Sequence, residues 1–280
     1  MNVVLLCKSR NHAKAVDLLN ACVEEDLHVN GIVALATPET SVSIKEAIRK
    51  LHERLARRKP TAAPVRLSSS NAPSSLPNGN FFSVEERNGQ TAFSQAKPVS
   101  QSFTLAAYAR QNKIPIKMAG ALNDQECEHA LRSFAPAVVL LGGVPLVREN
   151  ILAIPKIGVL NVHMGWLPGV RGMNAAEWSI FNDRPVAVSV HFVDAGVDTG
   201  AILYREKFDV SHYDQLAEMR RQLSAFQHRV LARAARLLLE QRLQPIPQKP
   251  EEGKQYYVMH PRLRTLVEMK LRAGFHAILE

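Results

Sequence analysis

Short apolar runs, separated by segments with helical periodicity, constrain the fold of this chain more than any other feature. The runs are Val3–Leu6, Gly31–Ala36 and Val138–Leu141. A continuous apolar run of this length is typical of a strand that is buried on both faces. Strands that alternate with helices predict an α/β protein with a doubly wound, mostly parallel sheet, which binds its ligands at the carboxyl ends of the strands.

Helix signals fill the intervals between these runs. Asn123-Asp124 is a candidate cap for a helix that follows it, and Ser211 with Asp214 predicts a capping box at the start of a long helix. Pro245 and Pro247 are expected to follow the end of that helix. The remaining expected elements are a helix along the Ala13–Cys22 stripe, a helix over Phe103–Gln111, an edge strand at Ile114–Ile116, a strand over Val186–Val193, and a short helix around Leu263, Leu266 and Met269.

Composition divides the chain into one large domain and a short extension. Residues 60–100 are rich in Ser, Asn, Pro and Gly, which predicts a flexible insertion. We therefore expect a single catalytic domain over residues 1–245 and a C-terminal extension over 246–280 that is too small to be a domain. The basic helix predicted over 44–59 either lies solvated on the body or contacts an anionic lipid or RNA surface.

Charge and cysteine content narrow the function classes. The net charge is +9, which suits an anionic partner or serves solubility alone. Cys7, Cys22 and Cys127 form no CxxC pair, which argues against a disulfide framework and a zinc site, so we expect no metal and a cytoplasmic location. No apolar stretch is long enough to span a bilayer. Phosphate-loop, GxGxxG and HExxH patterns are also absent from the sequence.

The stretch from Val159 to Leu203 carries the chemistry. Asn161 and His163 are two apart on a predicted strand, so both project to one face near its carboxyl end. Asp198 lies in a glycine-punctuated loop after the next strand. An amide that stabilises oxygen charge, an imidazole that moves protons and a carboxylate that orients it make a set suited to acyl transfer. No Ser or Cys nucleophile accompanies them, which favours attack by an amine of the substrate. A packed or surface histidine is the alternative interpretation of His163.

Two linked motifs resemble those of the folate-dependent formyltransferases, a group that includes the methionyl-tRNA, glycinamide ribonucleotide and sugar N-formyltransferases. Asn161-Val-His163-Met-Gly-Trp-Leu-Pro-Gly-Val-Arg171-Gly is similar to the family pattern Asn-x-His-x-Ser-x-Leu-Pro-x-x-Arg-Gly. Asp194-Ala-Gly196-Val-Asp198-Thr199-Gly200 matches Asp-x-Gly-x-Asp-Thr-Gly. The resemblance implies the Rossmann-like formyltransferase fold, with 10-formyltetrahydrofolate as formyl donor.

The resemblance also assigns roles to residues. It makes Asn161, His163 and Asp198 the catalytic trio. The pterin ring is expected between two loops, whose candidate cofactor-binding residues are Leu141, Gly142, Gly143, Val144, Asp194, Gly196, Thr199 and Gly200.

Because the sequence departs from the family pattern at several positions, the resemblance does not identify the acceptor. Gly165 stands where the pattern has Ser, and Trp166 follows it. Lys8 and Arg10 are candidates to hold an acceptor phosphate or are exposed loop charges. Arg171 either steers an anionic acceptor or anchors its turn. The tRNA enzymes carry a C-terminal β-barrel for which no sequence remains here, which favours a small, phosphorylated or nucleotide-linked amine.

Other aromatic and imidazole side chains are expected to be structural. We interpret His191 as a packed histidine of its strand, and Trp178 and Phe181 as core contacts. We interpret Tyr256 and Tyr257 as core residues, and residues that floor an acceptor pocket are the alternative interpretation.

Three functions therefore stay open. The first is formyl transfer to a small-molecule amine, and the second is formylation of methionyl-tRNA, with the basic 44–59 helix replacing the barrel. The third is a catalytically silent protein that binds folate or a partner.

Overall fold

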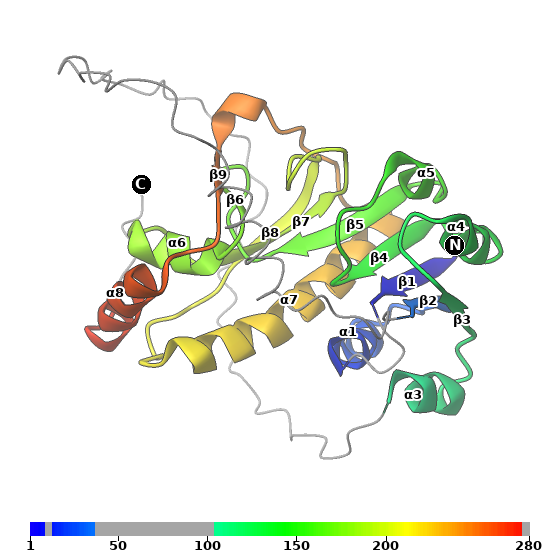
Figure 1. Ribbon diagram of the computed structural model, residues 1–280, viewed down its shortest axis with the longest axis horizontal. Coiled ribbons are helices and arrows are strands. Elements are labelled where there is room, and N and C mark those ends of the chain that lie inside the picture. The colour runs from blue at the N-terminus through cyan, green and yellow to red at the C-terminus, as the bar shows by residue number, and fades with distance from the viewer. Residues whose placement is uncertain (9–12, 37–103, 276–280) are drawn as a thin grey trace, which may run out of the picture. The chain divides into compact units, whose positions relative to one another are not determined.

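A seven-stranded sheet organises the chain in a computed structural model, which describes residues 1–8, 13–36 and 104–275 (Figure 1). Its strands are β1 (Val3–Cys7), β2 (Gly31–Leu35), β3 (Ile116–Ala119), β4 (Val138–Gly142), β5 (Gly158–His163), β7 (Ala187–Phe192) and β8 (Ile202–Lys207). They lie in the order β3-β2-β1-β4-β5-β7-β8, and of these strands β7 alone runs opposite to the others, so its pairings with β5 and β8 are antiparallel. The predicted doubly wound, mostly parallel α/β sheet is confirmed.

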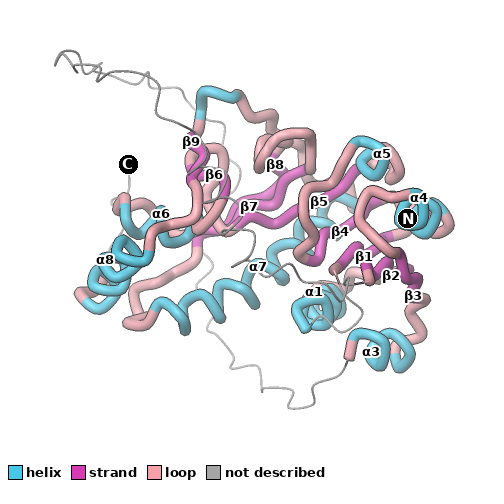
Figure 2. Tube along the Cα trace, viewed as in Figure 1, coloured by secondary structure: helices cyan, strands magenta, loops and turns pink. Residues whose placement is uncertain are grey.

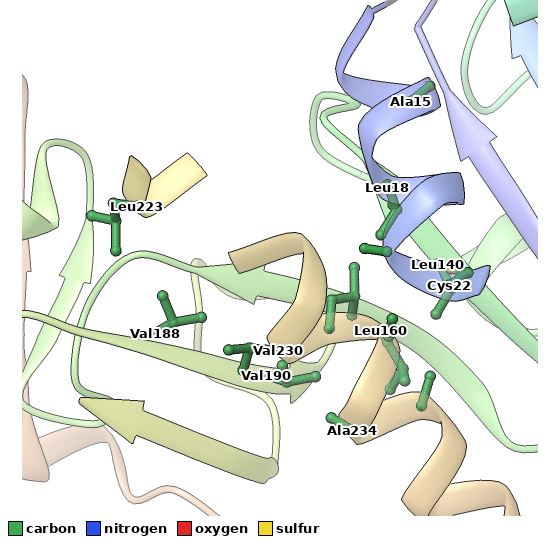
Figure 3. Packing of buried hydrophobic residues seen from close by; sticks show 14 of the residues in the cluster. Ala15, Leu18, Cys22, Leu140, Leu160, Val188, Val190, Leu223, Val230 and Ala234 are labelled. Carbon is green, nitrogen blue, oxygen red and sulfur yellow. The ribbon is translucent and has the colours of Figure 1, made fainter. Parts of the chain in front are cut away.

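Helices cover both faces of this sheet. Helices α1 (Ala13–Glu24), α3 (Leu105–Gln111) and α7 (Leu216–Leu239) contribute to one buried cluster, and α4 (Gln125–Arg132) and α5 (Glu149–Leu152) contribute to the other. Figure 3 shows Leu18 of α1 and Val230 of α7 gathered with Leu140, Leu160 and Val190 of the strands. Each central strand supplies apolar side chains to both clusters, because successive residues point to opposite faces. This explains why the strands appear in the sequence as continuous apolar runs.

The two predicted helix caps have different outcomes. Asp124 caps α4 as expected, because its side chain accepts a hydrogen bond of 2.7 Å from the Cys127 N–H. The predicted capping box at Ser211 is wrong, since α7 begins at Leu216 and its N-cap residue makes no side-chain hydrogen bond. Residues before the helix instead form a turn in which the Tyr213 ring stacks on Phe208, with 5.8 Å between ring centroids.

The C-terminal segment returns to the body and forms a small second sheet. Strands β6 (Val170–Gly172) and β9 (Lys254–Tyr256) lie side by side in parallel (Figure 2). Gly172 has φ +90°, and a Cβ there would stand 2.2 Å from the Tyr256 carbonyl oxygen, so the pairing requires glycine at this position. The C-terminal segment also contains a 3₁₀ helix (Pro250–Glu252) and α8 (Pro261–Arg272). Helix α8 packs against α6 (Ala175–Phe181).

Helix α8 is present as predicted, but its apolar face differs from the expected one. Val267 and Leu271 are buried, whereas Leu266 is 45% and Met269 59% exposed. The Lys270 ammonium group helps to set this rotation. It donates to the carbonyl of Phe181 at 2.9 Å and to the Asp183 carboxylate at 2.7 Å, which ties the Val267 side of α8 to α6.

Several sequence predictions lie outside the described residues. They are the basic helix over 44–59, the insertion over 60–100 and the phosphate-binding role of Arg10. In the described part of the chain, no helix is long and apolar enough to span a membrane.

Candidate active site

Strand alternation places four polar side chains on one face of the sheet. In β5, Asn161 and His163 alternate with Leu160 and Val162, which enter the apolar cluster on the opposite face. The antiparallel register pairs Asn161 with His191 and His163 with Ser189 of β7. Ser189 holds the loop after β5, since its hydroxyl donates to the Gly165 carbonyl at 2.6 Å and accepts from the Leu167 N–H at 3.0 Å.

Asp198 completes a cluster with these strand residues. Its Oδ2 lies 3.2 Å from Nδ1 of His163, and its Oδ1 lies 3.5 Å from Nε2 of His191. The same Nε2 is 3.2 Å from Nδ2 of Asn161, and Nδ1 of His191 is 2.7 Å from the Phe192 carbonyl. A His191 ring protonated at Nδ1 donates to that carbonyl and accepts from the Asn161 amide. The structure thus brings Asn161, His163 and Asp198 together, with His191 between the amide and the carboxylate.

Backbone and side-chain contacts hold Asp198 in a left-handed conformation, with φ 54°. The Gly172 N–H donates to its carboxylate at 2.9 Å. The Gln248 amide donates to the main-chain carbonyls of Asp198 and Gly200, at 3.1 and 2.6 Å. Arg171 is only 5% exposed and donates to the Gln248 side chain at 3.2 Å. Of the two roles predicted for Arg171, this geometry favours the anchoring one.

The charges of the cluster follow from these contacts. Burial alone would raise the pKa of Asp198, but the interaction with the His191 side chain, the charge of His163 and the hydrogen bond from the Gly172 N–H outweigh it and lower that pKa to about 2. Burial lowers the pKa of His163, against the opposing effect of the Asp198 charge. Asp198 is therefore a carboxylate at neutral pH. Nε2 of His163 also lies 2.8 Å from the Val170 carbonyl, so a neutral ring satisfies one acceptor and an imidazolium satisfies both.

Gly165 has a physical reason to depart from the family pattern. A Cβ at this position would stand 2.6 Å from Nε2 of His163 and 2.8 Å from the Val170 carbonyl oxygen. The absence of a side chain lets the imidazole reach that carbonyl. The neighbouring Trp166 ring packs against the basic side chains of β8, 4.5 Å from the Arg205 guanidinium.

The predicted donor-binding residues lie at the end of β4 and in the loops that follow β4 and β7, the two strands beside β5. Leu141 and Gly142 are buried, Gly143 is exposed with φ 73° and Val144 is half-buried. Asp194 shapes its own loop, because its Oδ1 accepts from the Gly196 N–H at 3.0 Å and from the Thr199 hydroxyl at 2.6 Å.

Close packing allows no side chain at Gly200, in the loop after β7. Lys8 and the aromatic residues named from the sequence lie outside the two loops. A Cβ at Gly200 would stand 1.9 Å from the Phe192 carbonyl oxygen. Lys8 is exposed at the end of β1. Among the expected aromatic core residues, Trp178 stacks on Tyr256 with 5.1 Å between centroids, but Tyr257 is exposed, contrary to expectation.

From the sequence, His191 is assigned only a packing role, although its side chain is part of the cluster, and Gln248 is not singled out. The alternation of Ser189 and His191 with Val188 and Val190 repeats the pattern of β5, and this signal could have identified His191. Gln248 carries no local signal, because it reaches Asp198 from 50 positions further along the chain.

Comparisons with known proteins show which family the chain resembles in sequence and in fold. The model of the family described as formyl transferase matches residues 83–235. Methionyl-tRNA formyltransferase of Acidithiobacillus ferrooxidans is 28% identical over 174 residues, which are 61% of this chain and 54% of that protein. The chain thus spans about half the length of this curated relative.

Two solved structures share the fold. Glycinamide ribonucleotide transformylase 1 from Symbiobacterium toebii has a TM-score of 0.52 at 18% identity and covers 88% of this chain and 94% of its own. A sugar N-formyltransferase from Shewanella sp. has a TM-score of 0.53 at 12% identity and covers 97% of this chain and 88% of its own. With more than half of its residues matched by the family model and with this fold, the chain belongs to the formyl transferase family.

Proposed function

We propose that this protein transfers a formyl group from 10-formyltetrahydrofolate to a primary amine of a small, phosphorylated or nucleotide-linked acceptor. The observation that carries the proposal is the convergence of Asn161, His163 and Asp198 on one sheet face. In this proposal residues 1–245 form the catalytic domain and 246–280 an extension that braces it. The three cysteines are buried and form no disulfide among the described residues, which supports a reducing, cytoplasmic location.

The side chains divide the chemistry among them. The folate donor supplies the formyl carbon that the amine nitrogen attacks. The Asn161 amide stabilises the charge that develops on the formyl oxygen, as oxyanion donors do. His163 accepts the proton that the attacking amine releases, and the Asp198 carboxylate stabilises the imidazolium so formed. The imidazolium then returns the proton to the folate nitrogen as the bond between that nitrogen and the formyl carbon breaks, which releases tetrahydrofolate. His191 orients the Asn161 amide through its Nε2.

The loops after β4 and β7 suit main-chain recognition of the pterin ring. Gly143 is exposed, so its backbone is accessible to a flat heterocycle. Asp194 and Thr199 give the second loop its shape through their hydrogen bond to each other and the bond from the Gly196 N–H to Asp194.

One observation supports a small acceptor. The matched solved structures are a ribonucleotide transformylase and a sugar N-formyltransferase, whose acceptors by name are small. The net charge of +9 suits an anionic acceptor of either size. Methionyl-tRNA is the second candidate, because the matched curated relative is a methionyl-tRNA formyltransferase.

A direct assay separates these candidates. The full chain is incubated with 10-formyltetrahydrofolate and, in turn, glycinamide ribonucleotide, an amino-sugar nucleotide or methionyl-tRNA, and tetrahydrofolate release is measured. We expect release with a small acceptor and a loss of about 10²–10³-fold in kcat for Asn161→Ala. Charge reversal at Arg49, Arg54, Arg57 and Arg58 should leave small-acceptor turnover unchanged, whereas an effect confined to tRNA would support the second candidate.

The assay also tests for a silent protein. Equal rates of donor consumption for His163→Ala and the parent across all acceptors would contradict the enzymatic proposal. Donor binding without release for any acceptor would support a catalytically silent folate-binding protein.

A further inference from the structure

An indole ring with two cations beside it lies at the edge of the sheet, outside the catalytic cluster. The Trp166 ring, in the loop after β5, has its centroid 4.5 Å from the Arg205 guanidinium and 5.8 Å from the Lys207 ammonium group. Both cations belong to β8, which is an edge strand. Trp166 and Arg205 are half-buried and Lys207 is exposed, so a ligand can reach the cations from solvent.

The strand register separates these cations from the carboxylate of their own strand. The register pairs Arg205 with Ser189 of β7, so Arg205 and, two positions on, Lys207 point to the sheet face that carries the catalytic cluster. Glu206 lies between them in sequence and points to the opposite face, where it pairs with Arg233 of α7 at 3.0 Å. In the part of the chain that the structure describes, no carboxylate forms an ion pair with either β8 cation.

Arg205 carries its charge into a half-buried position without an anionic partner. Its Nη1 donates to the Leu167 carbonyl at 2.9 Å, and the guanidinium makes no other hydrogen bond among residues 1–8, 13–36 and 104–275. Burial lowers the pKa of Arg205, as expected for a cation that loses hydration and gains no carboxylate. A guanidinium has five N–H donors in a planar fork, so most of those on Arg205 remain for a ligand.

A third basic side chain reaches the loop that carries Trp166. Nη1 of Arg184 lies 3.4 Å from the position that a Cβ would take at Gly169, three residues after Trp166. Arg184 is exposed and pairs with no carboxylate of the described residues. The loop therefore has three basic side chains beside it, which come from β8 and from the turn before β7.

Main chain separates these basic side chains from the catalytic cluster. In the register Ser189 lies between His163 and Arg205, and its hydroxyl is hydrogen-bonded to Gly165 and Leu167 of the loop. The loop thus crosses this sheet face between the imidazole and the guanidinium. An anion bound at Arg205 does not touch the reacting groups, and the inference is independent of the proposed function.

We propose that Arg205 and Lys207, together with Arg184, form a binding site for a phosphate group beside Trp166. The guanidinium fork donates to two phosphate oxygens, and the Lys207 ammonium group donates to a third. A phosphate dianion balances both β8 charges, whereas a single carboxylate balances one. The ligand is free phosphate or the phosphate group of a small ester, because both present the same dianionic head to the site.

The alternative role of Arg205 is structural, since it holds a carbonyl of the loop and packs on the indole. Lys207 separates the two roles, because within the described chain it makes no hydrogen bond and its replacement leaves the loop contact in place. Lys207→Gln removes one charge from the site. The matched control is Lys117→Gln: Lys117 also lies over an aromatic ring, 5.4 Å from the Phe134 centroid, but on β3 at the opposite edge of the sheet.

The experiment is an NMR titration of the full chain at pH 8 and low salt, where a phosphate group is a dianion. Inorganic phosphate and glycerol 3-phosphate are added separately, and glycerol is the uncharged counterpart. The indole N–H resonances of Trp166 and Trp178 are the readout, because the sequence holds no other tryptophan, and Trp166→Phe assigns them. The Trp178 N–H is bonded to the Tyr257 carbonyl and provides an internal control.

We expect both phosphates to shift the Trp166 resonance saturably, glycerol to leave it unchanged, and the Trp178 resonance to stay in place. Lys207→Gln should weaken phosphate binding about tenfold and Lys117→Gln by less than about twofold. Tighter binding of glycerol 3-phosphate than of inorganic phosphate would assign the site to a phosphate ester, and the reverse order would assign it to the free anion.

Three results would overturn the proposal. They are the lack of a saturable shift at Trp166, equal affinity of Lys207→Gln and the parent, and an equal loss of affinity in Lys207→Gln and Lys117→Gln, which would reduce the effect to net charge. Thermal unfolding by circular dichroism checks that each variant is folded. If Lys207→Gln does not fold, Arg184→Gln decides, because unchanged phosphate binding in that variant contradicts the proposal.

Discussion

Adding a methyl group at Gly165 tests whether the position of His163 depends on the missing side chain. In Gly165→Ala the new Cβ would stand 2.6 Å from Nε2 of His163, 2.8 Å from the Val170 carbonyl oxygen and 2.9 Å from the Ala175 Cβ. These distances are all below 3.0 Å, so at least one neighbour must move. Val170 and Ala175 are held in a strand and a helix, which leaves the imidazole ring as the group that is displaced.

The magnitude follows from two effects. Overpacking of a close-packed site costs about 1–3 kcal/mol. Displacement of the ring also breaks the 2.8 Å contact of His163 with the Val170 carbonyl, and a buried polar group left without a partner costs about 1–3 kcal/mol. We therefore expect Gly165→Ala to lower the free energy of unfolding by about 2–6 kcal/mol. Gly165→Ser shares the Cβ and should lose as much, although the family pattern has serine here.

Gly169, in the same loop, provides the matched control. A Cβ there meets its nearest neighbours at 3.4 Å, so Gly169→Ala should change the free energy of unfolding by less than about 1 kcal/mol. Urea unfolding at pH 7 gives both values, and the His163 ring resonances report whether the ring has moved. Loss of less than about 0.5 kcal/mol in Gly165→Ala, with unchanged His163 resonances, would refute the reasoning.

Three further perturbations address the cluster. Asp198→Asn should lower the free energy of unfolding at pH 7 by about 2 kcal/mol, because the pKa of Asp198 is lowered from 3.8 to about 2 and each unit corresponds to about 1.4 kcal/mol. This contribution is present above the unfolded-state pKa and is lost as pH falls from about 4 to 2. Urea unfolding of Asp198→Asn and the parent at pH 7 and pH 2.5 measures it. An equal difference in the free energy of unfolding at the two pH values would contradict the prediction. Gln248→Leu should release the Asp198–Gly200 segment, with faster amide hydrogen exchange at Thr199 and Gly200 and a lower kcat at unchanged acceptor KM, whereas unchanged exchange would show that Gln248 does not hold the segment. Burial lowers the pKa of His163, so the acidic limb of the rate–pH profile should lie below pH 6.5, and a limb above that value would assign the limb to another group.

The strands and the catalytic candidates were accessible from the sequence because both are encoded locally. Buried parallel strands require apolar residues on both faces, so Val3–Cys7 and Val138–Gly142 stand out as runs. Polar residues that interrupt such a strand with a period of two, as Asn161 and His163 do, identify the face that carries the site. The cap at Asp124 was also readable, since its partner lies three residues away.

Contacts between distant segments were decided only by the tertiary structure. Gln248 reaches the Asp198 carbonyl across 50 positions, and Arg220 of α7 reaches Glu177 of α6 across 43. The start of α7 and the buried face of α8 also depend on partners elsewhere in the chain, namely Phe208 and Asp183. Local sequence specifies which residue types point to a face of a strand or helix. Which of them meet is set by how the strands pair and how the C-terminal segment packs back, and that depends on the free energy of the whole packed chain.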